Sequence, residues 1–548
     1  MDLQRAFLAI VLSFFILIGY QYFFVKPVPQ AEQAAIQTEQ QASSVEGTQT
    51  KTPAAAPAQA TNIPTVPVDP NAREISIDTP LYAAVVNEQG GGLQSFVLKK
   101  YRNTHDKDSG PMQLVTGQNP ADLPVLFSLD NGAAVNLPVF HADTDSVNVA
   151  QPTDTASLAM SATTPEGVRI ERSLTFRGDS YLVDITYTLV NTTDKALQVS
   201  PALSLANKPF EHTSKTSRYL FSGPAAYINK ELVETKPKKL KDGPLVLQGQ
   251  VSWTGYVDNY FMTSVAPTTD GAHSVTLQGS EAHVRSVISE GIASLASGES
   301  KTYSYTLYFG PKKLNVLKTY GYDLAEAVNF GWFDFLAKPM LWMLNFLHQF
   351  LGNYGFSIIF LTILIKLVFW PITQKGMKSM KNMQKLQPKI AKLKERFKDD
   401  PSKMNQEMMA LYKTYKVNPL GGCLPMLIQI PFFFALYRVL MAAIELRHAP
   451  FMLWITDLSA PDRLMIGFDI PYLHGIPVLT LLMGASMYLQ QKMTPTTADP
   501  SQAKIMQFLP IVFTFMFLNF ASGLVLYWFV NNLLSILQQY LINRQVKA

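Results

Sequence analysis

The longest polar region of the chain has hydrophobic residues at every second position. Residues 168–176, 181–190 and 302–310 alternate in this way, and turn-forming residues separate the first two segments. Period two is typical of strands with one buried and one solvated face. The pattern predicts a large antiparallel β domain over residues 73–330, which we expect to be a β-sandwich with a helix at its C-terminal end.

Apolar runs outside this region predict six transmembrane α-helices, because each is about as long as the roughly 20 residues that cross a bilayer. We expect residues 1–25 to be an uncleaved N-terminal anchor, since no small-residue cleavage pattern follows them. The other five form the expected core within residues 351–548. Their approximate ranges are 355–373, 421–443, 471–491, 505–521 and 523–541.

Three further segments connect these parts. Residues 26–72 are rich in Pro, Ala, Gln and Thr and nearly free of large apolar residues, which predicts a flexible linker. Residues 331–350 place apolar side chains at helical spacing with few charges, which suits an amphipathic helix in the membrane interface or an ordinary packed helix. Residues 374–418 predict a helical hairpin, in which Asp400 caps and Pro401 begins the second arm.

Composition excludes several classes of function. The net charge of +5 over 548 residues is modest, so it gives little support to nucleic-acid binding. The single cysteine, Cys423, cannot form an intramolecular disulfide or a cysteine-based zinc site. Nucleotide-binding and hydrolase motifs are absent, and the eight histidines show no ligand spacing. We therefore expect no enzyme activity, no cofactor and no metal site.

Charge distribution predicts the orientation of the chain. The hairpin segment 374–418 is strongly basic, so the excess of Lys and Arg in short loops places it in the cytoplasm, together with both termini. The β domain and the acidic loop 445–469 then lie on the periplasmic side. The basic faces of the hairpin either rest on anionic lipid or dock ribosomal RNA or a soluble targeting factor. The candidate docking residues are Lys385, Lys389, Lys392, Lys394, Arg396 and Lys398.

Lys366 is the one charged residue of the 355–373 run. It either snorkels toward the headgroups or faces a hydrated cavity, and no acidic residue in the second, third, fifth or sixth span could neutralise it. Thr362 shares its helical face, because the two are four residues apart. Polar residues elsewhere in the spans must face one another or water. They are Gln429, Asn519, Asn531, Ser535 and Gln538.

Six strings identify a resemblance. They are LQPKI (386–390), EMMALYK (407–413), VNPLGGCLPMLIQIPFF (417–433), ELRHAPF (445–451), QKMTPTT (491–497) and SGLVLYW (522–528). Together they closely resemble the YidC family of bacterial membrane protein insertases, most densely over 356–541. The resemblance implies a hydrophilic groove, open to the cytoplasm and to lipid, with Lys366 where the family usually has arginine. Thr362, Gln429, Asn519 and Ser522 would line this groove, and the implied contacts to a client segment are Ile430, Pro431, Phe433, Met516 and Trp528.

The resemblance also implies a function and partners. A chain of this kind would insert and help fold newly made proteins of the Gram-negative inner membrane, alone or with the Sec translocon, without nucleotide hydrolysis. Its partners would be nascent membrane proteins, membrane lipids, and ribosomes delivered through the signal recognition particle pathway, with no small-molecule substrate. The alternative is a small-anion transporter or channel that uses Lys366, although no inverted internal repeat is visible.

Overall fold

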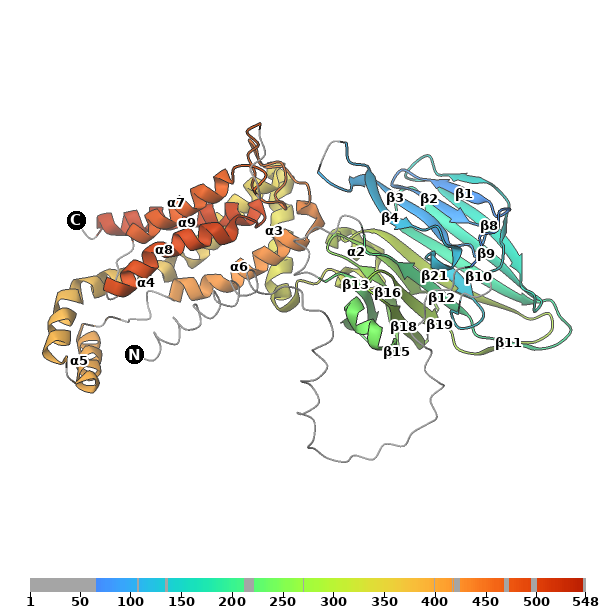
Figure 1. Cartoon of the computed structure of the whole chain (residues 1–548), viewed down its shortest axis with the longest axis horizontal. Coiled ribbons are helices and arrows are strands. Elements are labelled where there is room, and N and C mark those ends of the chain that lie inside the picture. The colour runs from blue at the N-terminus through green and yellow to red at the C-terminus, as the bar shows by residue number, and fades with distance from the viewer. Residues whose placement is uncertain are drawn as a thin grey trace, which may run out of the picture. The chain divides into compact units, whose positions relative to one another are not determined.

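The computed structural model describes residues 66–105, 108–133, 137–210, 221–269, 271–398, 400–415, 417, 424–467, 473–493 and 500–545. The expected N-terminal anchor and most of the expected linker lie outside the described residues. A β domain comes first along the described chain, and a bundle of helices follows it (Figure 1).

The alternating segments form the centre of a nine-stranded sheet. In β9 (Val168–Arg177), every second side chain from Val168 to Phe176 is buried, as period two predicts. Its neighbours are β10 (Leu182–Asn191) on one side and β8 (Thr155–Thr163) on the other. The sheet continues through β21 (Ser300–Pro311), β17 (Phe261–Pro267), β16 (Val251–Val257), β13 (Gly223–Ile228) and β14 (Glu231–Glu234), and ends at β6 (His141–Ala142) beyond β8.

Two five-stranded sheets and one two-stranded sheet complete the domain. The first runs in the order β4 (Pro111–Thr116), β3 (Leu93–Arg102), β2 (Tyr82–Asn87), β1 (Glu74–Asp78) and β7 (Ser146–Asn148). The second runs in the order β15 (Leu245–Gly249), β18 (His273–Gly279), β19 (Val284–Ser289), β12 (Ala202–Asn207) and β5 (Leu126–Ser128). The small sheet pairs β11 (Leu197–Val199) with β20 (Ala293–Leu295). Short 3-10 turns are η1 (Pro120–Asp122) and η3 (Pro237–Asp242).

These strands are antiparallel except for the parallel pair β1 and β7, which agrees with the predicted class of sheet. Large side chains such as Trp253 and Phe127 are fully buried between the layers. Burial of apolar surface stabilises the folded state by about 25 cal/mol per Å², and it is the main stabilising contribution in the domain.

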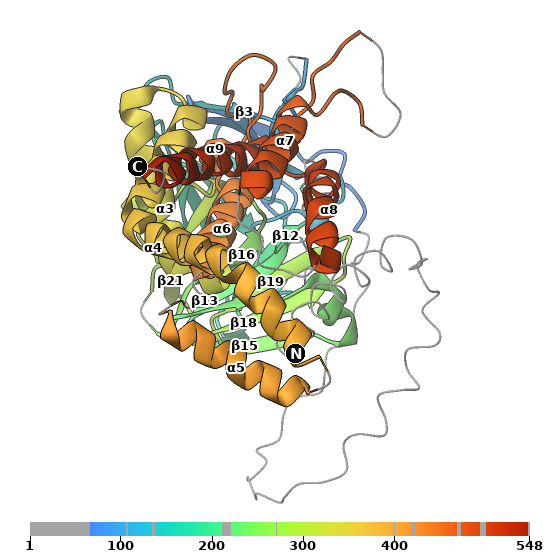
Figure 2. The ribbon, with the colours of Figure 1, turned by 90° about the vertical axis from the view of Figure 1, so that its left-hand side faces the viewer.

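The predicted helix after the β domain is α2 (Leu314–Tyr320), followed by the 3-10 turns η4 (Leu324–Ala327) and η5 (Gly331–Phe333). The remaining helices are α3 (Asp334–Leu351), α4 (Tyr354–Arg396), α5 (Pro401–Thr414), α6 (Leu424–Ala442), α7 (Val478–Met493), α8 (Pro500–Phe517) and α9 (Ser522–Gln545), with the turn η7 (Ile444–Leu446) after α6. α9 packs against both α4 and α7, and Figure 2 shows α4 and α8 on opposite sides of the bundle.

Helix α4 joins the expected second span and the first arm of the hairpin in one continuous helix of 43 residues. It begins where the Asn353 side chain accepts hydrogen bonds from the backbone N–H groups of Gly355 and Phe356. In the described part of the chain, α4 alone is both long and apolar enough to cross a bilayer; 428–442 and 507–517 are shorter apolar segments. The number of six spans therefore stays a prediction.

The two arms of the hairpin form as predicted from Asp400 and Pro401. The carboxylate of Asp400 accepts a hydrogen bond from the backbone N–H of Lys403, and Pro401 is the first residue of α5. A small separate core of Met383, Leu386 and Val417 holds the hairpin together.

Candidate functional site

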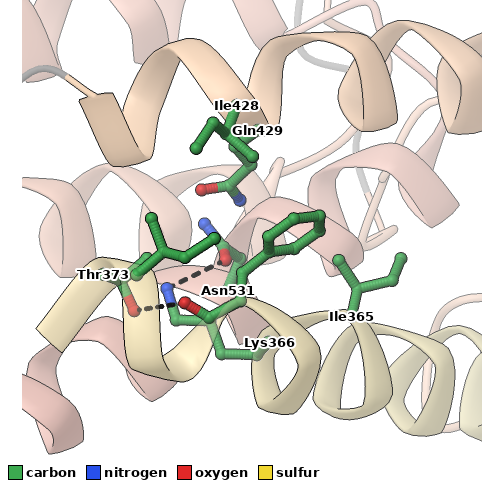
Figure 3. A pocket seen from close by; sticks show the side chains of 8 residues that line it. Ile365, Lys366, Thr373, Ile428, Gln429 and Asn531 are labelled. Atoms are coloured by element: carbon green, nitrogen blue, oxygen red, sulfur yellow. Dashed lines mark hydrogen bonds between the residues drawn. The ribbon is translucent and has the colours of Figure 1, made fainter.

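Lys366 lies inside the helix bundle and is 8% exposed. Its ammonium donates hydrogen bonds to the Ser535 hydroxyl, at 2.7 Å, and to the Asn531 side-chain oxygen, at 3.4 Å. Asn531 and Ser535 are four residues apart on α9, so one face of that helix supplies both acceptors. The ammonium thus points toward α9 inside the bundle, and not toward the outer surface of the bundle or along α4 (Figure 3).

The depth of Lys366 follows from the start of α4. Lys366 comes 12 residues after Tyr354, the first residue of the helix. At about 1.5 Å per residue, this separation is roughly 18 Å along the axis. In a bilayer core of about 30 Å, a helix that begins at the interface places such a residue near the middle.

Both partners of the ammonium are neutral. Among the residues that the structure describes, no carboxylate forms an ion pair with Lys366. A buried charge in this setting is costly unless a counter-charge or water reaches it. Within the described residues the positive charge thus has no counter-charge, and it can attract an anionic group.

A hollow of about 340 Å³ adjoins the ammonium. It lies between α4, α6 and α9, with Gln429 of α6 across from Lys366 (Figure 3). The lining residues are Ile365, Lys366, Phe369, Ile372, Thr373, Ile428, Gln429 and Asn531.

Polar contacts continue along α9 on both sides of this point. Toward the start of α9, the Tyr527 hydroxyl accepts a hydrogen bond from the Gln429 amide at 3.4 Å. Toward its end, the Gln538 amide donates to the Thr373 hydroxyl at 2.9 Å. One face of α9 is therefore polar: Tyr527 contacts α6, and Asn531, Ser535 and Gln538 on the following turns contact α4.

Of the groove residues inferred from the sequence, the structure brings Lys366 and Gln429 together at the hollow. Thr362 is buried, and its hydroxyl donates to the backbone oxygen of Ile358 on its own helix at 2.6 Å. Asn519 accepts a hydrogen bond from Arg463, and Ser522 donates to the backbone oxygen of Asp457. Thr362, Asn519 and Ser522 are therefore not among the lining residues of this hollow.

Thr373 and Asn531 line the hollow instead, while Ser535 bonds to Lys366 and Gln538 bonds to Thr373 beside it. The sequence signal for the three α9 residues is their spacing of four and then three, which puts them on one helical face. That spacing identifies the face of α9 but not the helix that lies opposite. The contact with Lys366 could be found only from the structure.

The loop between α6 and α7 covers the start of α9 and of α7. Backbone bonds join Ser522 N to the Ala460 oxygen at 2.7 Å and Gly523 N to the Leu458 oxygen at 2.9 Å. Buried Asp462 accepts a bond from the Trp454 indole at 2.6 Å and from the backbone N–H of Thr480 at 3.1 Å, which caps α7. This end of the bundle is closed by a loop with many fixed hydrogen bonds.

The client-contact residues inferred from the sequence occupy two environments. Phe433 and Trp528 meet edge to face with ring centres 4.9 Å apart, and Trp528 also contacts Phe517 of α8. Ile430, one turn before Phe433 on α6, is 40% exposed. Met516 is half-buried, as is Pro431, which lies inside α6. Phe433 and Trp528 therefore pack in an aromatic cluster, whereas Ile430 is open on the surface, and client contact by the five residues stays a prediction.

The basic candidates of the hairpin lie on the C-terminal part of α4, apart from Lys398 just after it. Four of them recur at intervals of four, three and four, which places them along one helical face. They are Lys385, Lys389, Lys392 and Arg396, and all four are exposed. Lys398 is also exposed and Lys394 is half-buried. The Lys389 ammonium lies 4.4 Å from the ring centre of Tyr415, so part of this face also ties the two arms together.

Comparison with known proteins identifies the family of this chain. A family model described as the YidC periplasmic domain matches residues 74–343, and one described as 60Kd inner membrane protein matches residues 346–548. The membrane protein insertase YidC of Syntrophobacter fumaroxidans is 42% identical over 553 residues, which cover 99% of each chain. The chain belongs to the YidC family. YidC of Geotalea daltonii is 40% identical over 554 residues and covers 100% of both chains.

The family resemblance read from the six sequence strings is thus confirmed over the whole chain. A solved structure of an active YidC insertase is 19% identical and covers 88% of this chain, with a TM-score of only 0.36. Within this YidC-family chain, the hollow beside Lys366 is the site that combines a charge, polar side chains from three helices and open volume.

Proposed function

We propose that this chain inserts newly made proteins into the bacterial inner membrane through the hollow beside Lys366. The observation that carries the proposal is the Lys366 ammonium, which is buried in the apolar part of α4 and, among the described residues, hydrogen-bonds the neutral side chains of Asn531 and Ser535 without an acidic partner. A polar segment of a client enters the hollow, and the charge draws an acidic group on it part of the way across. The apolar barrier that the segment must cross is shortened by that distance.

Electrostatics gives the size of this effect. Two unit charges 4 Å apart attract by about 4 kcal/mol at an effective dielectric constant of about 20. A lysine supplies this attraction as a point charge, without the two-point contact of a guanidinium. Lys366 therefore suits clients with a carboxylate in the translocated segment.

Transfer of the client into lipid provides the driving force without nucleotide hydrolysis. Each Leu, Ile, Phe or Val at the bilayer centre contributes roughly 0.3–0.6 kcal/mol on the insertion scale. About 20 such residues yield roughly 6–12 kcal/mol, which exceeds the cost of detaching an acidic group from Lys366. The client leaves sideways past α6 and α8, near Ile430, Phe433 and Met516.

The exposed surface supports a membrane location. On α4, the side chains of Leu364, Leu367 and Val368 are 44%, 62% and 62% exposed, as lipid-facing residues are. Helix α3 buries Met340 and Leu344, yet its other faces expose aromatic rings, which fits a helix in the membrane interface. These rings belong to Phe335, Trp342, Phe346 and Phe350, with Trp332 just before the helix.

The proposed arrangement has six spans in a Gram-negative inner membrane, with both termini and the hairpin in the cytoplasm and the β domain in the periplasm. The exposed basic face of the hairpin supports contact with a ribosome delivered by signal recognition particle, or with anionic lipids. The chain would work alone or beside the Sec translocon. Nascent membrane proteins are its substrates, and it needs no small molecule.

The alternative, a small-anion transporter or channel, gains no support from the comparisons, because the two relatives from Syntrophobacter and Geotalea are named insertases. One preparation tests both functions. Proteoliposomes with the purified chain should insert a short acidic-tailed client, as measured by protease protection, and should show no chloride flux above that of empty vesicles. Chloride flux without insertion would reverse the choice.

A further inference from the structure

A short turn in the loop between α6 and α7, residues 451–455, exposes apolar side chains at its tip. Leu453 is 80% exposed and Met452 is 46% exposed. The residues around them, 449–456, read APFMLWIT and carry no charge. Single exposed apolar residues are common on protein surfaces and need no explanation. Here the backbone conformation, the packing and the neighbouring surface distinguish the turn from such scattered residues.

The backbone at Leu453 has a conformation that leucine rarely adopts. Its φ is +56°, in the left-handed region. Turn positions of this kind usually hold Gly, Asn or Asp, which tolerate a positive φ. Two backbone hydrogen bonds fix the turn: Ile455 donates to the Met452 oxygen at 3.1 Å, and Phe451 donates to the Ile455 oxygen at 3.0 Å. The chain therefore holds a large apolar side chain outward at a position where turn geometry favours a small or polar residue.

The turn packs against the first turn of α4. The Asn353 amide, next to the start of α4, donates a hydrogen bond to the backbone oxygen of Phe451 at 2.9 Å. The rings of Phe451 and Phe356 meet edge to face with their centres 5.3 Å apart. The Phe451 ring also lies so close to Gly355 that any side chain there would collide with it. The turn is thus fixed beside the end of α4 at which the apolar segment begins.

The exposed face of α4 leads to this turn. Exposed apolar side chains follow α4 at intervals of four, four and three residues, which places them on one helical face. They are Phe356, Phe360, Leu364 and Leu367. Such a row on a helix that crosses a bilayer faces lipid. Because Phe356 at the end of this row contacts Phe451, the lipid-facing surface of α4 continues into the turn.

We propose that the tip of this turn inserts Met452 and Leu453 into the bilayer, just below the headgroups of the leaflet in which α4 begins. Only the side chains enter, because irregular backbone exposed to lipid does not occur within the hydrocarbon region. Trp454 suits this level, since indole rings are enriched at membrane interfaces, and its N–H is held by buried Asp462 at 2.6 Å. The contact involves neither the hollow nor a client, so it does not rest on the insertase function proposed above.

Insertion of the turn fixes the depth of α4 in the bilayer. The turn is bonded to Asn353, whose side chain caps α4, so the start of the helix stays at the level of the headgroups. Lys366 comes 12 residues after Tyr354, the first residue of α4. Its position near the middle of the bilayer depends on where the helix starts. The turn therefore also sets the depth of the Lys366 ammonium.

Fluorescence quenching of the full-length chain in phosphatidylcholine vesicles tests the proposal. Cys423, the single cysteine, is replaced by serine, and the label NBD is attached after Leu453→Cys. The matched control is Ile292→Cys, because Ile292 is an apolar residue of the β domain that is 79% exposed. Lipids with a doxyl group near the headgroup end of the acyl chain should quench the label at position 453 and not that at position 292. Iodide in the water should quench mainly the label at position 292.

Two results would overturn the proposal. Iodide quenching at position 453 as strong as at position 292, without quenching by doxyl lipid, would place the turn in water. Protection from iodide without quenching by doxyl lipid would show that a second copy of the chain or another protein covers the turn.

A pair of substitutions separates the side chain of Leu453 from the turn itself. The label is placed by Met452→Cys. Leu453→Asn keeps a residue that tolerates the positive φ but removes the apolar contact, whereas Leu453→Phe keeps an apolar side chain. Quenching by doxyl lipid should fall at least about twofold with Leu453→Asn and stay nearly unchanged with Leu453→Phe. Equal quenching in both variants would contradict insertion of Leu453. Lys366→Met should leave the quenching unchanged, so failure of the insertase function and failure of the lipid contact are distinguishable.

Discussion

The charge of Lys366 should be coupled to a carboxylate in the client. We consider Lys366→Met, which keeps an unbranched side chain of similar length and removes the ammonium. The client is paired with a version in which one tail Asp is replaced by Asn. Because Lys366 has only neutral partners, Asn531 and Ser535, no protein carboxylate in the described chain competes with that of the client.

The expected coupling is at most about 4 kcal/mol, from the attraction of charges 4 Å apart at a dielectric constant of about 20. Since each 1.4 kcal/mol is tenfold, this bound is several hundredfold in the insertion equilibrium. The assay is protease protection of the client tail in proteoliposomes, measured for all four combinations of protein and client as a double-mutant cycle. Lys366→Arg is the control, because it keeps the charge.

In the unaltered chain and in Lys366→Arg, the Asp client should insert better than the Asn client. In Lys366→Met, this advantage should disappear. If the ratio between the two clients is the same with Met as with Lys at position 366, the ammonium of Lys366 does not attract the client carboxylate during insertion.

Two further predictions concern hydrogen bonds. Ser535→Ala removes the 2.7 Å bond to the Lys366 ammonium, and it should weaken insertion of acidic-tailed clients by roughly 1.5–3 kcal/mol, the contribution of a hydrogen bond to a charged group. Ser535→Thr should restore insertion. The control is Asn532→Ala, next to the site but bonded to Ser486 on α7, which should leave the preference for acidic tails unchanged. In the β domain, the hydrogen bond that the His273 imidazole donates to the Glu290 carboxylate raises the pKa of His273. The bond therefore stabilises the fold below the unfolded pKa near 6.5, and this gain is lost as the pH rises through the higher folded pKa. Glu290→Gln should therefore lower the free energy of unfolding by roughly 1.5–3 kcal/mol at pH 5.5 and by less at pH 8.5, as measured by urea titration with circular dichroism; an equal loss at both pH values would exclude this linkage.

Local sequence patterns predicted much of this fold. Period two located the central strands such as β9 because each strand has one buried face, and Asp400 with Pro401 marked the start of α5 because capping depends on neighbouring residues. Lys366 stood out because a charge within an apolar run needs a partner or water. These features depend on residues close together in the sequence.

The composition of the site depended on contacts between distant segments. Helical spacing put Asn531 and Ser535 on one face of α9, but it could not show that this face meets α4. Asn519 and Ser522 are polar residues near the start of α9, and the loop between α6 and α7 folds back to bind them. A loop path of this kind has no periodicity, so the sequence did not predict it.

The most direct test of the central claim is a photocrosslink from the hollow to a client. A photoreactive amino acid at position 429 lies at the hollow, and one at position 481, where Leu481 on α7 is 51% exposed, serves as the control. With a ribosome-stalled nascent membrane protein, we expect position 429 to form adducts with the polar segment of the client, and position 481 to form none. No adduct from position 429, or equal adducts from both positions, would contradict passage of the client beside Lys366.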